Sequence, residues 1–263
     1  MYETTYHRAD SLADAASKIG DEGKYLAGGQ TLLPTMKQRL AAPSDLIDLS
    51  KIEDMKGITI DGKSVKIGAM TTHAEVAAHD GLRAVCHGIT DMGGWIGDPH
   101  VRHRGTIGGS IANNDPAADY PSAMMALDAT IHTDQREIAA DDFFTGMFET
   151  ALNEGEIITA VSFTAPEKCA YEKFRNPASR YAMAGVFVAH HGDTVRVGVT
   201  GASSGGVYRA TDMEDALAAD FSADALDGCT VDEGDMLSDI HGSAEYRAHL
   251  VKVMAKRAVA AAH

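Results

Sequence analysis

The alternation of apolar and polar positions changes twice along the chain and divides it into three segments. The first alternates short helical and strand-like stretches, beginning with a helix that Ser11 would cap, and it predicts a compact βαβ-like unit. The second opens on a hairpin pattern, in which the apolar runs 58–60 and 65–67 flank a polar turn. Beyond about residue 165 the pattern favours an antiparallel sheet with helices. We therefore expect an α+β protein with units at 1–55, 56–165 and 166–263.

Helical spacing and capping residues predict the helices, and the sequence Thr72-His73-Ala74-Glu75 fits a capping box. The predicted helices, apart from the one after Ser11, are 32–40, 73–79, 83–92, 123–127, 212–217 and 244–261. The predicted strands are 25–27, 45–49, 58–60, 65–67, 130–133, 136–138, 157–163, 170–174, 184–190 and 195–200.

Two glycine loops carry the strongest chemical signal, Ala27-Gly28-Gly29-Gln30-Thr31 and Gly105-Thr106-Ile107-Gly108-Gly109-Ser110. Each is expected to follow a strand or extended segment and to offer several backbone N–H groups with little side-chain bulk, so that an anion can approach. Pro34 is tolerated in the first turn of a helix, which places the first loop at a helix N-terminus, where the helix dipole suits a phosphate. Neither loop has the Walker A or the Rossmann spacing. Two such loops about 80 residues apart suggest one dinucleotide, a flavin, held from two sides, the alternative being two tight turns without a ligand.

Composition limits the partners and the compartment. The formal charge of -15 would repel nucleic acid and anionic membrane surfaces, so we expect no nucleic-acid binding and no membrane insertion. The N-terminal residues lack the pattern of a signal peptide, and no apolar run reaches the length of a membrane span, which predicts a cytoplasmic protein. Cys86, Cys169 and Cys229 are scattered, so neither a metal or iron–sulfur site nor a disulfide scaffold is expected.

Three other patterns carry weaker chemical signals. The sequence Gly201-Ala202-Ser203-Ser204-Gly205 spells a nucleophile elbow, but the following residues start a helix poorly, so a loop is the better interpretation. His100 and His103 lack the spacing of a zinc helix. Asp141 and Asp142 are expected to be solvated. No catalytic residue is therefore predicted in this chain.

An ordered set of motifs spread over nearly the whole chain resembles one family, the FAD-binding medium subunit of the molybdenum hydroxylases. That family is typified by aerobic carbon monoxide dehydrogenase and is related to the flavin domain of xanthine dehydrogenase. The motifs are Ala27-Gly28-Gly29-Gln30-Thr31-Leu32-Leu33-Pro34, Ile96-Gly97-Asp98-Pro99, Arg104-Gly105-Thr106-Ile107-Gly108-Gly109-Ser110, Asp115-Pro116-Ala117-Ala118-Asp119-Tyr120-Pro121, Asp141-Asp142-Phe143-Phe144, Tyr171-Glu172-Lys173-Phe174-Arg175 and the segment 238–247.

The resemblance implies a fold of the vanillyl-alcohol-oxidase type. Two FAD-binding α+β subdomains, 1–55 and 56–165, would enclose the cofactor, and 166–263 would form a C-terminal domain with a three-stranded antiparallel sheet and helices. Relatives often have His-Ser where this chain has Gln30-Thr31, so a histidine attachment of the flavin is excluded here and FAD is expected to be held noncovalently.

Carried over by position, the resemblance assigns cofactor contacts to both loops. Gly28, Gly29, Gln30 and Thr31 would surround the pyrophosphate from one side, and Thr106, Gly108, Gly109 and Ser110 from the other. Asp119 would accept hydrogen bonds from the ribose or adenine side, Ile158 would pack near the cofactor, and Tyr181 would lie near the isoalloxazine ring. Arg175 would stand where relatives commonly have lysine. The further implied positions are Ala27, Leu32, Leu33 and Asn113.

The resemblance also implies partners and a reaction. A large subunit with the molybdenum cofactor would oxidise the substrate, and a small subunit with two [2Fe-2S] clusters would pass electrons to the FAD of this chain, in a dimer of heterotrimers. Two alternatives stay open at this point: a stand-alone reductase of the same fold, similar to UDP-N-acetylmuramate dehydrogenase, and a hydrolase that uses Ser203.

Overall fold

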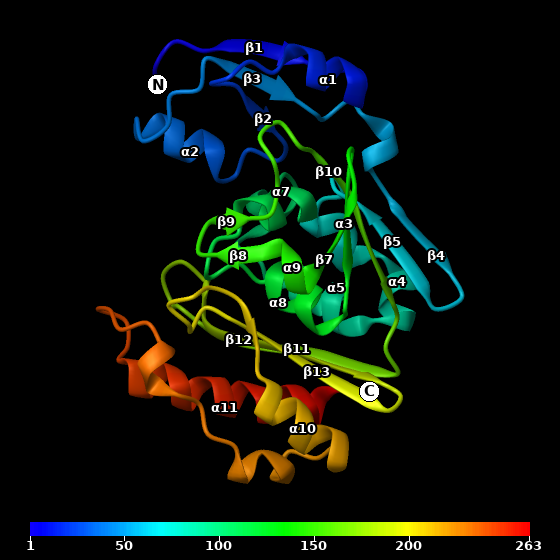
Figure 1. The fold of residues 1–263 in the computed structure, drawn as a ribbon, viewed down its shortest axis with the longest axis vertical. Coiled ribbons are helices and arrows are strands. Elements are labelled where there is room, and N and C mark those ends of the chain that lie inside the picture. The colour runs from blue at the N-terminus through cyan, green and yellow to red at the C-terminus, as the bar shows by residue number, and fades with distance from the viewer.

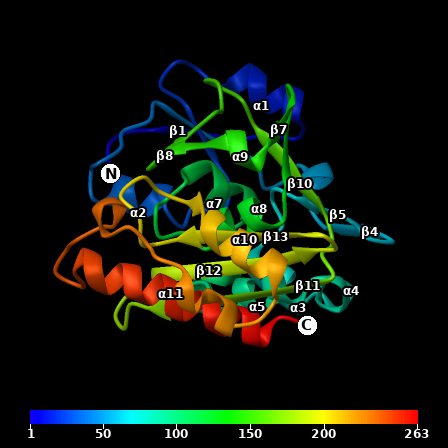
Figure 2. The ribbon, with the colours of Figure 1, turned by 60° about the horizontal axis from the view of Figure 1, so that its bottom comes forward.

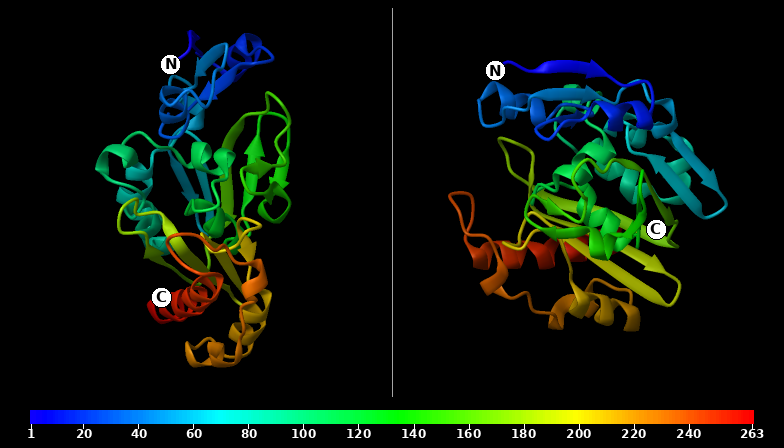
Figure 3. Two further views of the ribbon diagram at one scale, coloured as in Figure 1. Left: turned by 90° about the vertical axis from the view of Figure 1, so that its left-hand side faces the viewer. Right: turned by 45° about the horizontal axis from the view of Figure 1, so that its top comes forward.

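The structure, a computed structural model, describes residues 1–263 and arranges the strands in three main sheets stacked along the longest axis (Figure 1). The N-terminal sheet lies at one end and the C-terminal sheet towards the other, and the three tiers are distinct in a side view (Figure 3). The N-terminal sheet contains β1(Thr5–Arg8), β2(Lys24–Leu26) and β3(Asp45–Asp48); the middle sheet contains β4(Ile58–Asp61), β5(Ser64–Gly68), β6(Thr130–Thr133), β7(Glu137–Ala139) and β10(Ile158–Thr164); and the C-terminal sheet contains β11(Lys168–Arg175), β12(Ala182–His191), β13(Thr194–Thr200) and β14(Tyr208–Arg209). A separate hairpin pairs β8(Phe144–Gly146) with β9(Glu149–Thr150).

Helices cover the sheets and connect their strands. The α-helices are α1(Leu12–Lys18), α2(Leu32–Lys37), α3(His73–Ala78), α4(Asp80–Val85), α5(His87–Gly94), α6(Pro99–Arg102), α7(Ile107–Asn113), α8(Tyr120–Ala126), α9(Ala140–Phe143), α10(Thr211–Ala219) and α11(Ala244–Ala261), and three 3-10 helices span Glu53–Met55, Asp224–Gly228 and Glu233–Asp235. No helix combines the length with the apolar composition that a bilayer span requires.

The N-terminal tier is a parallel sheet of order β1-β3-β2, built from successive β–α–β connections. The Ser11 hydroxyl accepts the Asp14 N–H at 3.1 Å and so starts α1, as its sequence predicts. The second connection places the first glycine loop between β2 and α2, with Pro34 inside the first turn of α2. The loop therefore lies at the carboxyl end of a parallel strand and the amino end of a helix, the position predicted for it.

The middle tier is an antiparallel sheet of order β4-β5-β10-β6-β7, and its helices follow the sequence pattern closely. The predicted capping box is present, because the Thr72 hydroxyl accepts the Glu75 N–H and the Glu75 carboxylate accepts the Thr72 N–H. The single helix predicted at 83–92 is instead two helices, α4 and α5. They separate at Cys86, whose φ of −157° and ψ of 74° lie outside the helical region.

The C-terminal sheet is covered on both faces. Helices α10 and α11 lie over one face (Figure 2), and α5 and α8 pack against the other. As a result β12 is buried on both sides, with Phe187 in the core shared with the middle tier and Val186 and Val188 in the core under α11. A strand buried on both faces has a continuous apolar sequence, which explains why the sequence pattern located it.

The predicted α+β class is confirmed, and two further details differ. A short fourth strand, β14, joins the three expected strands of the C-terminal sheet. The second glycine loop follows the helix α6, and the expectation of a strand or extended segment before it was wrong. The reason is local, because the Asp98 carboxylate accepts the Val101 N–H at 2.9 Å and Pro99 occupies the first turn, so the residues before the loop form a capped helix.

Candidate functional site

A cavity of about 640 Å³ lies where the first glycine loop faces the middle tier. Its volume falls in the range typical of small-molecule and cofactor sites, about 300–1,000 Å³. The wall combines backbone from the two glycine loops with apolar side chains from several elements. Among the lining residues are Ala27, Gly28, Gly29, Gln30, Thr31, Leu32, Met70, His73, Ile96, Val101, Thr106, Gly108, Gly109, Ser110, Asn113, Asp119, Ile158 and Tyr181.

The first loop presents a run of unused backbone donors to this cavity. None of the five N–H groups from Gly28 to Leu32 donates a hydrogen bond within the chain. Gly29 has a φ of +71°, a conformation that favours glycine and turns the backbone into α2. Consecutive free N–H groups at a helix N-terminus form a site for an anion.

The two glycine loops touch each other, although they are far apart in the sequence. A Cβ atom at Gly28 would lie only 2.1 Å from the Arg104 carbonyl oxygen and 2.7 Å from the Gly105 Cα. The backbone of one loop therefore packs directly on the backbone of the other, and only glycine fits at position 28. This contact joins the N-terminal tier to the middle tier at the cavity.

The second loop does not offer the free N–H groups that its sequence predicts. The Gly108 N–H donates to the Ala69 carbonyl at 2.8 Å, and the Ile107 N–H donates to the Thr71 carbonyl at 3.1 Å. The Gly109 N–H caps α7 on the Thr106 hydroxyl at 3.2 Å. The expectation of several open amides was therefore right for the first loop and wrong for the second, whose amides are held by partners 36 to 39 residues earlier or by its own cap.

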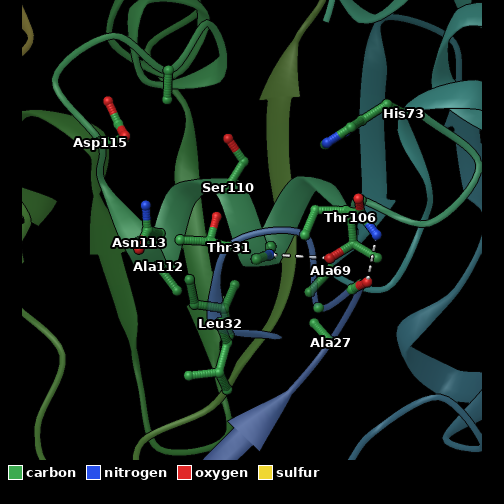
Figure 4. A pocket seen from close by; sticks show the side chains of 18 of the residues that line it. Ala27, Thr31, Leu32, Ala69, His73, Thr106, Ser110, Ala112, Asn113 and Asp115 are labelled. Carbon is green, nitrogen blue, oxygen red and sulfur yellow. Dashed lines mark hydrogen bonds between the residues drawn. The ribbon is translucent and has the colours of Figure 1, made fainter. Parts of the chain in front are cut away.

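On the second side of the cavity the side chains of Ser110 and Asn113 replace these amides, and Thr31 adds a hydroxyl from the first loop. Thr31, Ser110 and Asn113 face the same space in Figure 4, and their side chains make no hydrogen bond within the chain. Two hydroxyls and a carboxamide can each donate to or accept from a ligand. The cavity is thus lined by neutral donors on both sides.

Asp119 lies in the cavity wall but is held by the C-terminal sheet. The Lys173 Nζ donates to both carboxylate oxygens of Asp119, at 2.9 and 3.0 Å, and the Tyr171 hydroxyl donates to one of them. Burial raises the pKa of Asp119, while Lys173 and Tyr171 oppose that rise. The carboxylate already has these donors, so this geometry does not favour the expected acceptor role towards a ribose.

Lys173 is a residue of this region that sequence reasoning missed. Its side chain is fully buried, and it stands two positions from Tyr171 on the same face of β11. The available signal was the strand alternation, which puts Lys173 on the same face as Cys169 and Tyr171, because buried lysines are almost always paired. The partner, 54 residues away, could not be read from the sequence.

Most of the other predicted positions also line the cavity, and their contacts with a cofactor stay predictions. Ile158 contributes from β10, and Tyr181, which is 52% exposed, contributes from the turn between β11 and β12. Two positions lie outside the wall. Leu33 packs beneath the loop, where its Cδ1 would be 2.8 Å from a Cβ at Gly29, and Arg175 stacks on Trp95 with its Cζ 4.7 Å from the ring centroid.

His73 is a second residue of the wall that the sequence did not single out. It is 5% exposed, its ring lies 5.3 Å from that of Tyr120, and its Nδ1 is buried without a hydrogen-bond partner. The ring extends towards the cavity in Figure 4. Burial, helped by the positive charge of Arg102, lowers the pKa of His73 to about 4, so the imidazole is neutral near pH 7.

This pKa predicts an acid-sensitive contribution to stability. Since the unfolded chain has a histidine pKa of about 6.5, the unfolded state binds more protons between pH 6.5 and pH 4, and stability falls as pH falls through that window. The expected loss is about 3 kcal/mol by pH 4. Urea unfolding from pH 7 to pH 4 should show that His73→Gln removes this slope, whereas His100→Gln, at an exposed histidine, retains it. Equal slopes in wild type and His73→Gln would contradict the assignment.

The weaker sequence patterns do not form sites. No helix follows Ser203, since β13 ends at Thr200 and α10 begins at Thr211, so the interpretation of a loop is confirmed. No group of three or more His, Cys, Asp and Glu side chains is placed to hold a metal ion. Asp141 and Asp142 are exposed, as expected, but Asp141 also has partners, because Arg196 and Arg209 bind its carboxylate at 3.1 and 3.0 Å. These arginines come from β13 and β14 of the C-terminal sheet, 55 and 68 residues away, so the sequence around Asp141 could not predict the pairing.

The fold and the cavity define a binding protein for an elongated, partly anionic ligand. Free N–H groups meet the requirement of a diphosphate, glycine allows main-chain approach, and the apolar side chains from α6 and β10 can cover a ring. The residues present therefore fit a flavin dinucleotide.

Comparison with known proteins identifies the family. The family described as "FAD binding domain in molybdopterin dehydrogenase" matches residues 2–166. The carbon monoxide dehydrogenase medium chain of Afipia carboxidovorans is 36% identical over 97% of this chain and 94% of its own length, and the nicotine 6-hydroxylase medium subunit of Paenarthrobacter nicotinovorans is 34% identical over 97% and 95%. A solved structure of reconstituted CO dehydrogenase from Oligotropha carboxidovorans superposes with a TM-score of 0.89 at 36% identity, covering 98% of this chain and 96% of that one.

The chain therefore belongs to the family of FAD-binding domains of molybdopterin dehydrogenases. It is an oxidoreductase subunit, and FAD is the cofactor of its family.

Proposed function

We propose that this chain is the FAD-binding, electron-transferring subunit of a heterotrimeric molybdenum hydroxylase. A large partner with the molybdenum cofactor would oxidise the substrate, a small partner with two [2Fe-2S] clusters would supply the electrons, and this chain would deliver them to an external acceptor. The observation that carries the proposal is the run of five unused N–H groups, from Gly28 to Leu32, packed against the second glycine loop. The named roles of the relatives, medium chains of carbon monoxide dehydrogenase and nicotine 6-hydroxylase, support it.

The residues divide the work of holding the cofactor. The N–H groups of the first loop would bind the diphosphate, and Thr31, Ser110 and Asn113 would orient it through neutral hydrogen bonds. Ile158 and the exposed Tyr181 would limit the access of water to the ring. When bound, FAD supplies a ring that accepts and releases electrons; the chain contributes position, hydrogen bonds and exclusion of water.

The cofactor is held noncovalently in this proposal. Gln30 lies in the first loop where a histidine would be needed for attachment, and its carboxamide nitrogen donates to the Gly28 carbonyl at 3.4 Å. A carboxamide nitrogen is neither basic nor a good nucleophile, so Gln30 would not form a covalent bond to the flavin. Acid precipitation should therefore release all of the yellow cofactor into the supernatant, and flavin that stays with the pellet would contradict noncovalent binding.

The remaining parts of the proposal concern organisation. We place the domain limits at 1–55, 56–165 and 166–263, in keeping with the residues that form the three sheets. We place the complex in the cytoplasm as a dimer of heterotrimers.

Coexpression with the partner subunits tests the function. The expected product is a yellow-brown complex in which removal of FAD abolishes electron delivery to an artificial acceptor while substrate still reduces the molybdenum centre. Persistence of electron delivery without FAD would overturn the proposal. Turnover of a soluble reductant by the isolated chain would instead support the stand-alone reductase, and hydrolysis lost in Ser203→Ala would support a hydrolase.

A further inference from the structure

Two cysteines from distant parts of the chain meet in the interior. The Sγ atoms of Cys86 and Cys169 are 3.4 Å apart, and the residues are only 1% and 2% exposed. Cys86 lies at the junction of α4 and α5, and Cys169 lies near the start of β11. The pair therefore spans the seam between the middle tier and the C-terminal sheet, away from the cofactor cavity, whose wall contains neither residue.

The first turn of α5 lies beside the two sulfur atoms, and a Cβ at Gly88 would be 3.2 Å from the Cys169 Sγ. The Gly88 N–H lowers the pKa of Cys169, and the Ile89 N–H acts in the same direction on Cys86. Backbone donors at a helix N-terminus stabilise a thiolate. The contact with Cys86 lowers the pKa of Cys169, while the pKa of Cys86 is raised. Either sulfur can donate the hydrogen bond between them, so access to the oxidant decides which one reacts first.

A second cavity gives access to one sulfur. It has a volume of about 580 Å³, and Cys169 lines it together with Arg83, His87 and Glu167, whereas Cys86 is not in its wall. A small oxidant entering this cavity would meet Cys169 first. Cys86 lies behind it, within reach of the product.

We propose that Cys86 and Cys169 form a redox modification site that hydrogen peroxide converts to a disulfide. The Cys169 thiolate attacks one peroxide oxygen, the O–O bond breaks, and a sulfenic acid forms while the departing hydroxide takes a proton to become water. The Cys86 sulfur then attacks the sulfenic sulfur, the S–S bond forms, and the hydroxide leaves with the Cys86 proton as a second water. Two thiols and one peroxide thus give one disulfide and two waters, and a dithiol reverses the change.

The cross-link would tie α5 to β11 by a short movement, because sulfur atoms 3.4 Å apart approach to about 2.05 Å in a disulfide. The same two elements meet again near the cofactor cavity. There Arg175 of β11 stacks on Trp95, the residue that follows α5, and Tyr171 and Lys173 of β11 hold Asp119. Oxidation would therefore fasten together two elements behind the cavity wall: α5, which leads through Trp95 to the lining residue Ile96, and β11, which holds the lining residue Asp119.

Peptide mapping of the full chain tests the site directly. After brief treatment with hydrogen peroxide, thiol titration of the denatured protein should fall from three cysteines to one. Trypsin under non-reducing conditions should yield a linked pair, residues 84–102 with 169–173, lighter by two hydrogen atoms than the sum of the two peptides and separated by dithiothreitol. The single tryptophan, Trp95, should change its fluorescence in step with the cross-link.

Cys229 provides the matched control, because it is partly exposed and outside the pair. The linked peptides should persist in Cys229→Ala and be absent in Cys86→Ala, in which dimedone should trap the Cys169 sulfenic acid. The peptide map of the wild-type protein tests the proposal even if one of these variants fails to fold. Three thiols remaining after treatment, oxidation of Cys229 alone, or unlinked sulfinic acid at Cys169 would each overturn the proposal.

Discussion

Replacing Gly28 with alanine should weaken FAD binding by about 100-fold or more. The new Cβ would stand 2.1 Å from the Arg104 carbonyl oxygen, inside any allowed contact, so the two loops have to separate. Loss of two hydrogen bonds from the loop amides to a charged diphosphate costs about 3 kcal/mol, which corresponds to about 100-fold in affinity. The flavin content of the purified protein and a fluorescence titration of the apoprotein with FAD measure the effect.

Gly20→Ala is the matched control for this change. A Cβ at position 20 would have no heavy atom within 4 Å and the backbone there has no positive φ, so the alanine variant should bind FAD as the wild type does. If Gly28→Ala retained a normal flavin content and affinity, the contact between the loops would not be needed for binding. The first loop would then lose its assignment as the diphosphate site.

Replacing Lys173 with methionine should lower the free energy of unfolding by about 3–5 kcal/mol. The change leaves the Asp119 carboxylate buried with Tyr171 but without its positive partner, and breaking a buried ion pair on one side has a cost of this size. The double variant Lys173→Met/Asp119→Leu removes both charges and should recover much of the loss. Urea unfolding of the three proteins gives the comparison.

A surface pair provides the reference for that experiment. Lys56 and Glu53 form an ion pair at 2.7 Å, but the Glu53 side chain is 78% exposed, so Lys56→Met should cost less than about 1 kcal/mol. A similarly small effect for Lys173→Met would show that the buried pair does not stabilise the seam between α8 and the C-terminal sheet.

The parts of the fold that local rules determine could be predicted. Ser11 and the capping box at Thr72 start their helices as expected, and the hairpin of β4 and β5 follows its turn sequence. The predictions that were wrong concern features that depend on residues far away in the sequence. The sequence on both sides of Cys86 favours a helix, so the local pattern does not show the break between α4 and α5. In the structure Cys86 contacts Cys169, which is 83 residues away.

The same distinction holds at the site. The first loop keeps its N–H groups free because no carbonyl packs against them, whereas carbonyls from Ala69 and Thr71 occupy those of the second loop. Glycine content alone could not separate these two situations. Asp119 lines the cavity, but Lys173 binds its carboxylate from the C-terminal sheet, and this partner could not be found from the sequence.

The ion pair of Asp119 and Lys173 has a consequence for how the chain can be divided. The family match ends at residue 166, yet the ammonium group of Lys173 and the ring of Tyr181 both come from beyond it. A fragment cut at that boundary would carry both glycine loops but would leave one carboxylate without its counter-charge and one side of the cavity open to solvent. The cofactor cavity therefore depends on residues beyond the family match, contributed by β11 and by the turn that follows it.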